Sequence, residues 1–354
     1  MPRRFLPFRP NTTIGLDISQ ESIKFVKLKR KNGKYTLLSY GILPFSAQKN
    51  NSPEDQTKAI SDILKELPGE NKRDSVDIFT AVFGEGVAIR NITIPQVTKT
   101  ELRQAVHWAG QKQLPFPLSE VNLEYKVLGE IKENDLTKKE ILLVAALKSL
   151  INERIGLFNR SNLDISGIST IPIALWNLCK LTNIDLSKGM LVEIGVKFTN
   201  ILIFRDNSLK LSREVLTPSD SQQQPTNNET SLSSPIDRLI NEISRSFSFF
   251  QKRYPDAQLE EISLTGDIAN LKSLPQIIKK KLGVEVSIIN PFKRVKILLP
   301  PEESDRLQDQ SPIFAVAMGL AIKDDKGINL LPDVIKRQKA INFIKFSLGL
   351  AGLE

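Results

Sequence analysis

TTIGLDISQESIKFVKLKRKNGKYTLLSYG, residues 12–41, is the stretch of sequence that decides the fold. A short apolar run ends at Asp17, and an alternating run follows it. The pair Asn32-Gly33 between two lysines is typical of a type I′ hairpin turn, because both residues tolerate positive φ. The stretch therefore predicts three consecutive strands, at Ile14–Leu16, Ser22–Leu28 and Tyr35–Leu43.

LVEIGVKFTNILIFRDNSLKLSREV, residues 191–215, repeats this plan far downstream. An apolar strand carries an acid, Glu193, and then Gly195, after which two more strands are expected on either side of a turn at Asp206–Ser208. When the two stretches are aligned by their acids, the first predicted turn falls at nearly the same position as the second. Such self-similarity indicates an internal duplication of a three-strand unit.

Two copies of this plan, separated by a mixed segment, resemble the actin-like ATPase fold. ELRQAVHWAGQKQLPFPLSEVNLEYKVLG, residues 101–129, is similar to a segment of the PilM family of type IV pilus assembly proteins. The resemblance extends over LLVAALKSLINERIGLF, LTGDIANLKSL and INPF, which occur in the family's order, and it runs from about Thr12 to Pro332. Its most specific part is LPFPLSEV, residues 114–121.

The resemblance implies an α/β fold: actin-like (RNase H-like) duplicated domains with a small α+β insertion subdomain. The expected parts are a disordered lead-in (1–11), a first actin-like domain (12–74 and 163–186), an inserted subdomain (75–162), a second actin-like domain (187–326) and a C-terminal tail (327–354). A flexible loop is expected within the second domain, at 217–235, because Leu232 is its only large apolar residue.

Local patterns add detail to this plan. Val76–Phe83 and Gly86–Ile94 are expected to form a strand pair around a glycine-rich turn. Thr98 and Glu101 have the spacing of a capping box that opens a helix. Ile168–Thr182 is expected to be a helix that returns to the first domain.

Composition narrows the class of protein. The 354 residues carry a net charge of +9, but the charges are spread over every segment and aromatic residues make up only 6%. We therefore expect no nucleic-acid partner. The basic residues near both ends suit an anionic membrane surface, which predicts peripheral membrane association through the tail. His107 and Cys179, the only histidine and cysteine, are assigned no chemistry.

The sequence shows no signal peptide and no apolar run of the roughly 20 residues that a membrane helix needs. A cytoplasmic protein is therefore expected. The resemblance places it at the inner membrane.

The resemblance also implies weak binding of ATP and Mg²⁺. It maps the first phosphate turn onto Asp17 and Ser19 with Lys24 behind it, the second onto Glu193 and Gly195 through Thr199, and the adenosine turn onto Gly266 and Asp267. Asp17 and Glu193 are the expected metal ligands. In the family pattern Ser19 would be glycine, Glu193 aspartate and Asp267 glycine. These departures predict a degenerate ATPase rather than an enzyme.

The segment INLLP resembles the cytoplasmic tail of PilN, the inner-membrane peptide that PilM proteins bind. Its residues are Ile328, Asn329, Leu330, Leu331 and Pro332. If the segment mimics that peptide, both leucines should lie in apolar pockets and the asparagine should bond to the edge of a groove. The alternative is an edge strand that completes the second domain.

The leading hypothesis is a cytoplasmic actin-like scaffold of type IV pilus (or related secretion) assembly, with a PilN-like partner and other pilus assembly proteins. An active sugar or metabolite kinase on the same fold is the second, and an FtsA-like division protein is the third. The kinase would need an intact adenosine turn and a catalytic acid, neither of which is evident in the sequence.

Overall fold

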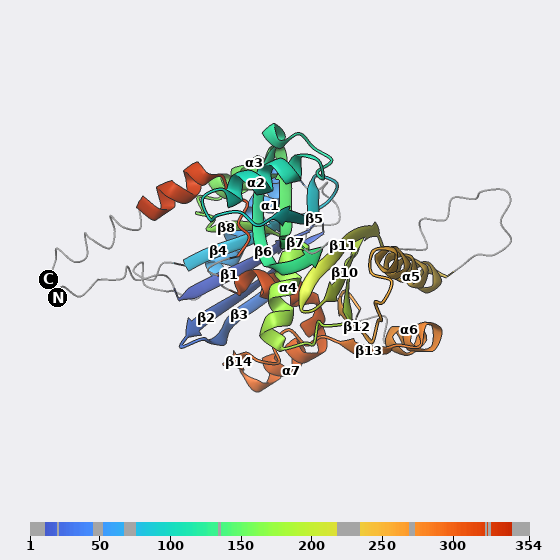
Figure 1. The fold of residues 1–354 in the computed structure, drawn as a ribbon. Coiled ribbons are helices and arrows are strands. Elements are labelled where there is room, and N and C mark those ends of the chain that lie inside the picture. Colours follow the sequence, from blue (N-terminus) through green and yellow to red (C-terminus); the bar gives the residue numbers. More distant parts are fainter. Residues whose placement is uncertain are drawn as a thin grey trace, which may run out of the picture.

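The computed structural model describes residues 11–19, 21–44, 52–66, 76–133, 136–217, 234–268, 273–322, 324 and 327–341. Figure 1 shows a first sheet, a second sheet beside it, and a smaller sheet over the junction of the two. Residues 1–10 of the expected lead-in (1–11) and most of the loop at 217–235 lie outside the described residues, as does the end of the tail.

The first sheet is built on the predicted three-strand unit. Its strands run in the order β14-β3-β2-β1-β4-β8. Asn32 and Gly33 have φ values of 51° and 77°, which confirms the predicted hairpin turn. The strands are β1 (Thr12–Ile18), β2 (Ser22–Lys31), β3 (Lys34–Pro44), β4 (Val76–Val82), β8 (Gly167–Thr170) and β14 (Lys296–Ile297).

The second sheet repeats the unit and runs in the order β11-β10-β9-β12-β13. A register shift falls between Lys27 and Leu28 in β2, and another between Ile203 and Phe204 in β10. The two register shifts are separated by the same number of residues as Asp17 and Glu193. This equal spacing supports the duplication. The strands are β9 (Gly189–Ile194), β10 (Phe198–Arg205), β11 (Ser208–Leu216), β12 (Glu261–Gly266) and β13 (Glu285–Ile288).

The second turn is shorter than expected. Only Asp206 and Asn207 have positive φ, at 53° and 58°, and Ser208 already begins β11. The turn therefore has the same two-residue form as the first, at the end of a shorter strand.

The inserted subdomain has a three-stranded sheet in the order β5-β7-β6, covered by α2 (Leu102–Gln111). Its strands are β5 (Val87–Pro95), β6 (Val121–Glu133) and β7 (Leu136–Leu147), and the short helix η1 (Leu118–Glu120) precedes β6. Thr98 and Glu101 form the predicted capping box: the backbone amide of Thr98 donates to Glu101 Oε2 at 3.1 Å, and that of Glu101 donates to Thr98 Oγ1 at 3.4 Å.

The expected strand pair at Val76–Phe83 and Gly86–Ile94 is wrong. β4 lies between β1 and β8 in the first sheet, whereas β5 pairs with β7. β4 is buried on both faces, as a central parallel strand must be. The inserted sheet thus begins after β4, later than the expected boundary at residue 75.

Helices cover the faces of the two large sheets. The expected helix at Ile168–Thr182 needs correction, because Gly167–Thr170 is strand β8 and α4 starts only at Ile171, with Pro172 in its first turn. The remaining helices are α1 (Pro53–Glu66), α3 (Lys148–Arg160), α4 (Ile171–Thr182), α5 (Pro235–Arg253), α6 (Leu274–Leu282), α7 (Pro301–Gln310), η3 (Ser311–Phe314) and α8 (Ala315–Ala321). Residues 333–341 are also helical. Over the described residues, no helix has both the length and the hydropathy to cross a membrane.

The small residues of α8 let it lie against backbone on two sides. A Cβ added to Gly15 in β1 would lie 1.9 Å from Ala317 O, and one added to Gly319 would lie 2.0 Å from Ala174 O in α4. Thr13 Oγ1 donates to Ala321 O at 2.5 Å. Three elements therefore meet at a spacing that only glycine permits.

We predict that Gly319→Ala lowers the free energy of unfolding by about 2 kcal/mol or more, because the methyl group would displace backbone rather than a flexible side chain. Gly129→Ala is the matched control, since a Cβ there meets no atom within 4 Å. Urea unfolding followed by circular dichroism measures both variants. Equal stability of the two would contradict the packing described for α8.

Candidate functional site

The two acids of the duplicated units meet in one cavity. Asp17 lies at the end of β1 and Glu193 at the end of β9, and both line a cavity of about 80 Å³ between the two large sheets. Ser19, Lys24 and Gly195 line it too. The structure thus brings together five of the eight residues expected to bind nucleotide.

The polar groups of the first turn are occupied within the turn. Ser19 Oγ donates to the carbonyl of Ser22 at 2.9 Å and accepts from its amide at 3.1 Å. The Ser19 amide itself donates to Ser22 O at 3.0 Å, and in the second turn the Gly195 amide donates to Phe198 O at 3.0 Å. Backbone amides that cradle a phosphate must be free to donate to it. These two are already used.

The acid of the first turn is shielded from water. Burial raises the pKa of Asp17, and the positive charges of Lys24 and Arg154 oppose that rise. Lys24 Nζ lies 3.8 Å from Asp17 Oδ2. The lysine is therefore held against the carboxylate within the cavity.

The acid of the second turn is held by an amide. Asn200 Nδ2 donates to Glu193 Oε2 at 2.8 Å. Burial raises the pKa of Glu193 to about 7, and the nearby Asp17 adds to the rise. A carboxyl that is partly protonated at neutral pH is a poor ligand for Mg²⁺, which prefers ionised oxygen ligands. Among the described residues, no three His, Cys, Asp or Glu side chains gather in an arrangement that would hold a metal ion.

Three expected residues do not line the cavity. Thr199 is buried behind it, with its hydroxyl 3.0 Å from Thr217 Oγ1. Gly266 has a φ of 94° and packs so tightly on β9 that an added Cβ would lie 2.3 Å from Ile194 O. The Asp267 amide donates to the same carbonyl at 2.6 Å. The expected adenosine turn therefore lies within the second sheet, where β12 ends beside β9.

The sequence alone missed several contributors to this cavity. Asn200 could have been noticed as an amide inside an apolar strand. Arg154 in α3 does not line the cavity, but its charge acts on Asp17, and no pattern near it in the sequence reports this. Its buried Nη1 has no hydrogen-bond partner among the described residues, and burial lowers its pKa to about 10. Further lining residues are Glu21, Phe83, Ile171, Val196, Lys197, Phe198, Glu214 and Val316.

The size of the cavity limits what it holds in this conformation. The free space of about 80 Å³ holds a few waters. A nucleotide needs a site of several hundred Å³. The cleft is closed around its own side chains.

A second candidate site lies at the outer edge of the first sheet, where residues 328–332 dock beside β8. The Leu330 amide donates to Ile168 O at 2.7 Å, and Asn329 Oδ1 accepts from the Ile168 amide at 3.2 Å. Asn329 Nδ2 donates to Ser166 O at 3.2 Å. Leu330 is fully buried and Leu331 is 2% exposed. The segment thus reproduces part of a strand ladder with one side chain acting as a bridge.

The inserted subdomain holds the same segment from the other side. Asn122 Nδ2 in β6 donates to Leu330 O at 2.8 Å. Arg103 in α2 pairs with Asp333 at 2.9 Å, and Lys336 pairs with Glu124 in β6. The expected alternative of an edge strand that completes the second domain is wrong, because these partners belong to the first sheet and the inserted subdomain.

The single histidine lies at the rim of the docking site, and the single cysteine lies outside both sites. His107 is exposed on α2 and lines the same cavity as Leu330 and Pro332. Cys179 is buried in α4, and burial raises the pKa of its thiol to about 12. A thiol with so high a pKa is unreactive at neutral pH.

The raised pKa of Glu193 predicts a pH-dependent stability. Its value of about 7 exceeds the ordinary 4.5, so the folded state binds this proton more tightly than the unfolded state. The stabilising contribution of this proton is therefore complete below pH 4.5 and is lost as the pH rises through 7. Glu193→Gln should remove this fall, which amounts to a few kcal/mol at most.

Melting temperatures between pH 5 and pH 8 measure the effect, with exposed Glu85→Gln as the control. Glu193→Gln should gain stability over wild type as the pH rises. Parallel curves for the two would contradict a buried, protonated Glu193.

Known proteins share this architecture. The family model described as type IV pilus assembly protein PilM matches residues 15–217 and 217–325. A solved PilM-PilN type IV pilus biogenesis complex is similar to the chain at 22% sequence identity and a TM-score of 0.71, over 87% of this chain and 97% of that chain. At this identity the match reports the fold, and it confirms the predicted actin-like α/β arrangement.

Two further structures are similar at lower scores. A Bacteroides thetaiotaomicron protein with an actin-like ATPase fold and unknown function has 16% identity and a TM-score of 0.43, over 80% of this chain and 92% of that chain. The cytoplasmic domain of EpsL, an inner membrane component of the type II secretion system of Vibrio cholerae, has 9% identity and a TM-score of 0.44, over 91% and 98%. Since the family model spans most of its length, the chain belongs to the PilM family of type IV pilus assembly proteins.

Proposed function

We propose that the chain is a cytoplasmic scaffold of type IV pilus assembly that binds the cytoplasmic tail of a PilN-like inner-membrane protein at the edge of β8. The observation that carries the proposal is the docking of residues 328–332 on that edge. A similar solved structure is described as a PilM-PilN complex. The chain's own segment resembles the PilN tail and would occupy the site when that partner is absent.

The chemistry of the edge suits an extended apolar peptide. Ser166 and Ile168 offer two backbone carbonyls and one amide to the segment. Such strand addition supplies affinity through the backbone and specificity through pockets for alternate side chains. Burying two leucines contributes roughly 3 to 6 kcal/mol before ordering costs. Because the chain's own segment is tethered, a free peptide must bind more tightly or be present at high concentration to displace it.

This arrangement would place the scaffold at the inner membrane through its partner. The helix at 333–341 follows the docked segment directly. Its Arg337 is exposed, whereas Lys336 pairs with Glu124 and Lys339 with Asp164. Basic side chains near an anionic surface each add about 1 kcal/mol of attraction. Peripheral association through this part of the chain is proposed as a second, weaker contact.

For the cleft between the sheets we propose weak binding of Mg·ATP without turnover. The amides of Ser19 and Gly195 are committed to their turns, Glu193 is partly protonated, and Asp267 lies outside the cavity. Opening of the cleft would have to precede binding. The kinase and division-protein alternatives receive no specific support from these contacts.

We predict that a chain ending at Gly327 binds a labelled peptide of residues 328–341 at least tenfold more tightly than the full chain does, because the site is vacated. Leu330→Asp in the full chain should behave like the truncation. Val334→Asp is the matched control, since Val334 is 78% exposed and the same charge enters. Fluorescence anisotropy measures the affinities.

The truncated chain will lose stability if the segment packs as described. Its melting temperature should then recover when the free peptide is added. A truncated chain that binds the peptide no better than the full chain, or that no peptide restabilises, would contradict exchangeable docking.

We predict that wild type turns over Mg·ATP well below about 1 s⁻¹, the lower end of ordinary enzyme rates. The triple variant Ser19→Gly, Glu193→Asp, Asp267→Gly, which restores the family pattern, should bind Mg·ATP more tightly in isothermal titration. An ordinary turnover rate in wild type that Asp17→Ala abolishes would contradict the proposal and favour the kinase alternative.

A further inference from the structure

A second groove runs between the inserted subdomain and the second domain, away from both sites described above. It joins two cavities of about 830 and 1140 Å³ that share Asn91, Gln113 and Arg253. Its walls are β5 and α2 on one side and β11 and α5 on the other. None of its lining residues belongs to the closed cleft or to the docking site of residues 328–332.

The groove is strongly basic. Its lining includes no acidic side chain among the described residues. Two carboxylates pair with part of the cationic set: Glu140 with Lys210, and Glu242 with Arg213 and Arg245. The cationic lining residues left without a carboxylate partner in the described part of the chain are Arg90, Lys112, Lys252 and Arg253. All four are exposed.

Two aromatic side chains mark the ends of the groove. Trp108 on α2 is 66% exposed and Phe249 on α5 is 62% exposed. Phe249 follows Arg245 by one helical turn and precedes Arg253 by another, so these three share one face of α5. That face is separate from the buried face, which carries Ile243 and Phe250. α5 therefore has an exposed basic and aromatic face that does not pack into the hydrophobic core.

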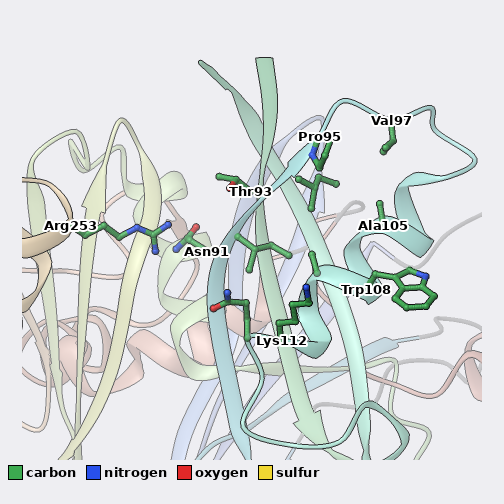
Figure 2. A pocket seen from close by; sticks show the side chains of 12 residues that line it. Asn91, Thr93, Pro95, Val97, Ala105, Trp108, Lys112 and Arg253 are labelled. Atoms are coloured by element: carbon green, nitrogen blue, oxygen red, sulfur yellow. The ribbon is translucent and has the colours of Figure 1, made fainter. Parts of the chain in front are cut away.

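The α2 end of the groove is apolar. Ile92, Ile94, Val97, Ala105 and Ala109 line it. Figure 2 shows Arg253 reaching from α5 toward Asn91 on β5, with Lys112 directly after the end of α2. An apolar floor beside a basic rim fits a peptide side chain better than a nucleic-acid backbone, which would leave the floor unfilled.

The strand at the floor has an open edge. β5 is the outer strand of its sheet, and the Leu147 amide donates to Gly86 O at 2.9 Å. Antiparallel pairs alternate, so the backbone of Asn91 and Thr93 faces away from β7. The Asn91 side chain already bonds to Leu209 O and Lys210 O at 3.0 and 2.8 Å, which joins β5 to β11. The backbone groups of Thr93 are therefore the ones placed to form hydrogen bonds with an extended chain.

We propose that this basic groove is a docking site for a second partner, an extended acidic segment of a protein that carries one large apolar side chain. The apolar residue would fill the α2 end, and the carboxylates would pair with Lys112, Lys252 and Arg253. This inference is independent of the PilN-like docking at β8.

The test uses the full-length chain and a fluorescein-labelled peptide of alternating aspartate and glutamate with one central phenylalanine. Two comparison peptides replace the phenylalanine by serine or the acids by lysine. The acidic peptide with its phenylalanine should bind at least tenfold more tightly than either, and its affinity should fall with added salt.

Lys252→Glu with Arg253→Glu should weaken that binding at least tenfold. Lys31→Glu with Lys34→Glu, which makes the same change in net charge on the exposed β2–β3 hairpin, should leave it within about twofold. Trp108→Ser should also weaken it, whereas Leu298→Ser, at a residue 60% exposed elsewhere, should not.

Equal binding of the three peptides, or equal loss in the groove and hairpin variants, would overturn the proposal. Single-stranded oligouridine or phosphatidylglycerol vesicles that bind through the same arginines and displace the acidic peptide would assign the groove to nucleic acid or lipid instead.

Discussion

The close packing of α8 against β1 and α4 is the constraint on which the rest of the structure depends. Gly15 and Gly319 bring three backbones together at a spacing that excludes any side chain. The turn before α8 also reaches the second sheet, because Thr265 Oγ1 donates to Pro312 O at 2.9 Å. The short helix α8 and the turn before it therefore contact both duplicated units. These contacts hold the ends of β1 and β9, which carry Asp17 and Glu193, on opposite sides of the cleft.

This tie explains why the cleft is closed. With the two sheets held by α8, Asp17 and Glu193 share about 80 Å³, and burial raises the pKa of both. A site built for nucleotide would keep both acids ionised and its turn amides free. In this chain the turn amides and the acids are instead engaged in contacts within the protein. The outer surfaces are better suited to binding partner proteins, because the edge of β8 presents backbone hydrogen-bonding groups and the basic groove presents positive charge.

The sequence predicted the elements that depend on local chemistry. Asn32-Gly33 and Asp206-Asn207 marked both hairpins because their φ preferences are local, and the acids at Asp17 and Glu193 located the cleft. The partner of β4 was beyond prediction, since a strand buried on both faces reads alike in a hairpin and in a parallel sheet.

Other features depend on contacts between distant parts of the chain. Strand β8 could not be predicted from the sequence, because its four residues are followed directly by the equally apolar α4 and no sequence signal separates the two. The charge of Arg154 acts on Asp17 from α3, and no sequence pattern near Arg154 reports that interaction. The basic groove is likewise assembled from α2, β5, β11 and α5, whose charges looked evenly spread along the sequence.

The most direct test of the central claim is hydrogen exchange of two backbone amides while a synthetic PilN-like cytoplasmic peptide is titrated into the full-length chain. The Leu330 amide donates to Ile168 O, and the Ile168 amide donates to the Asn329 side chain. If the partner displaces the chain's own segment from β8, Leu330 should lose protection while Ile168 keeps it, because the incoming peptide renews the edge contacts. Unchanged protection of Leu330 at saturating peptide would show that residues 328–332 are a permanent part of the first domain and would contradict the account.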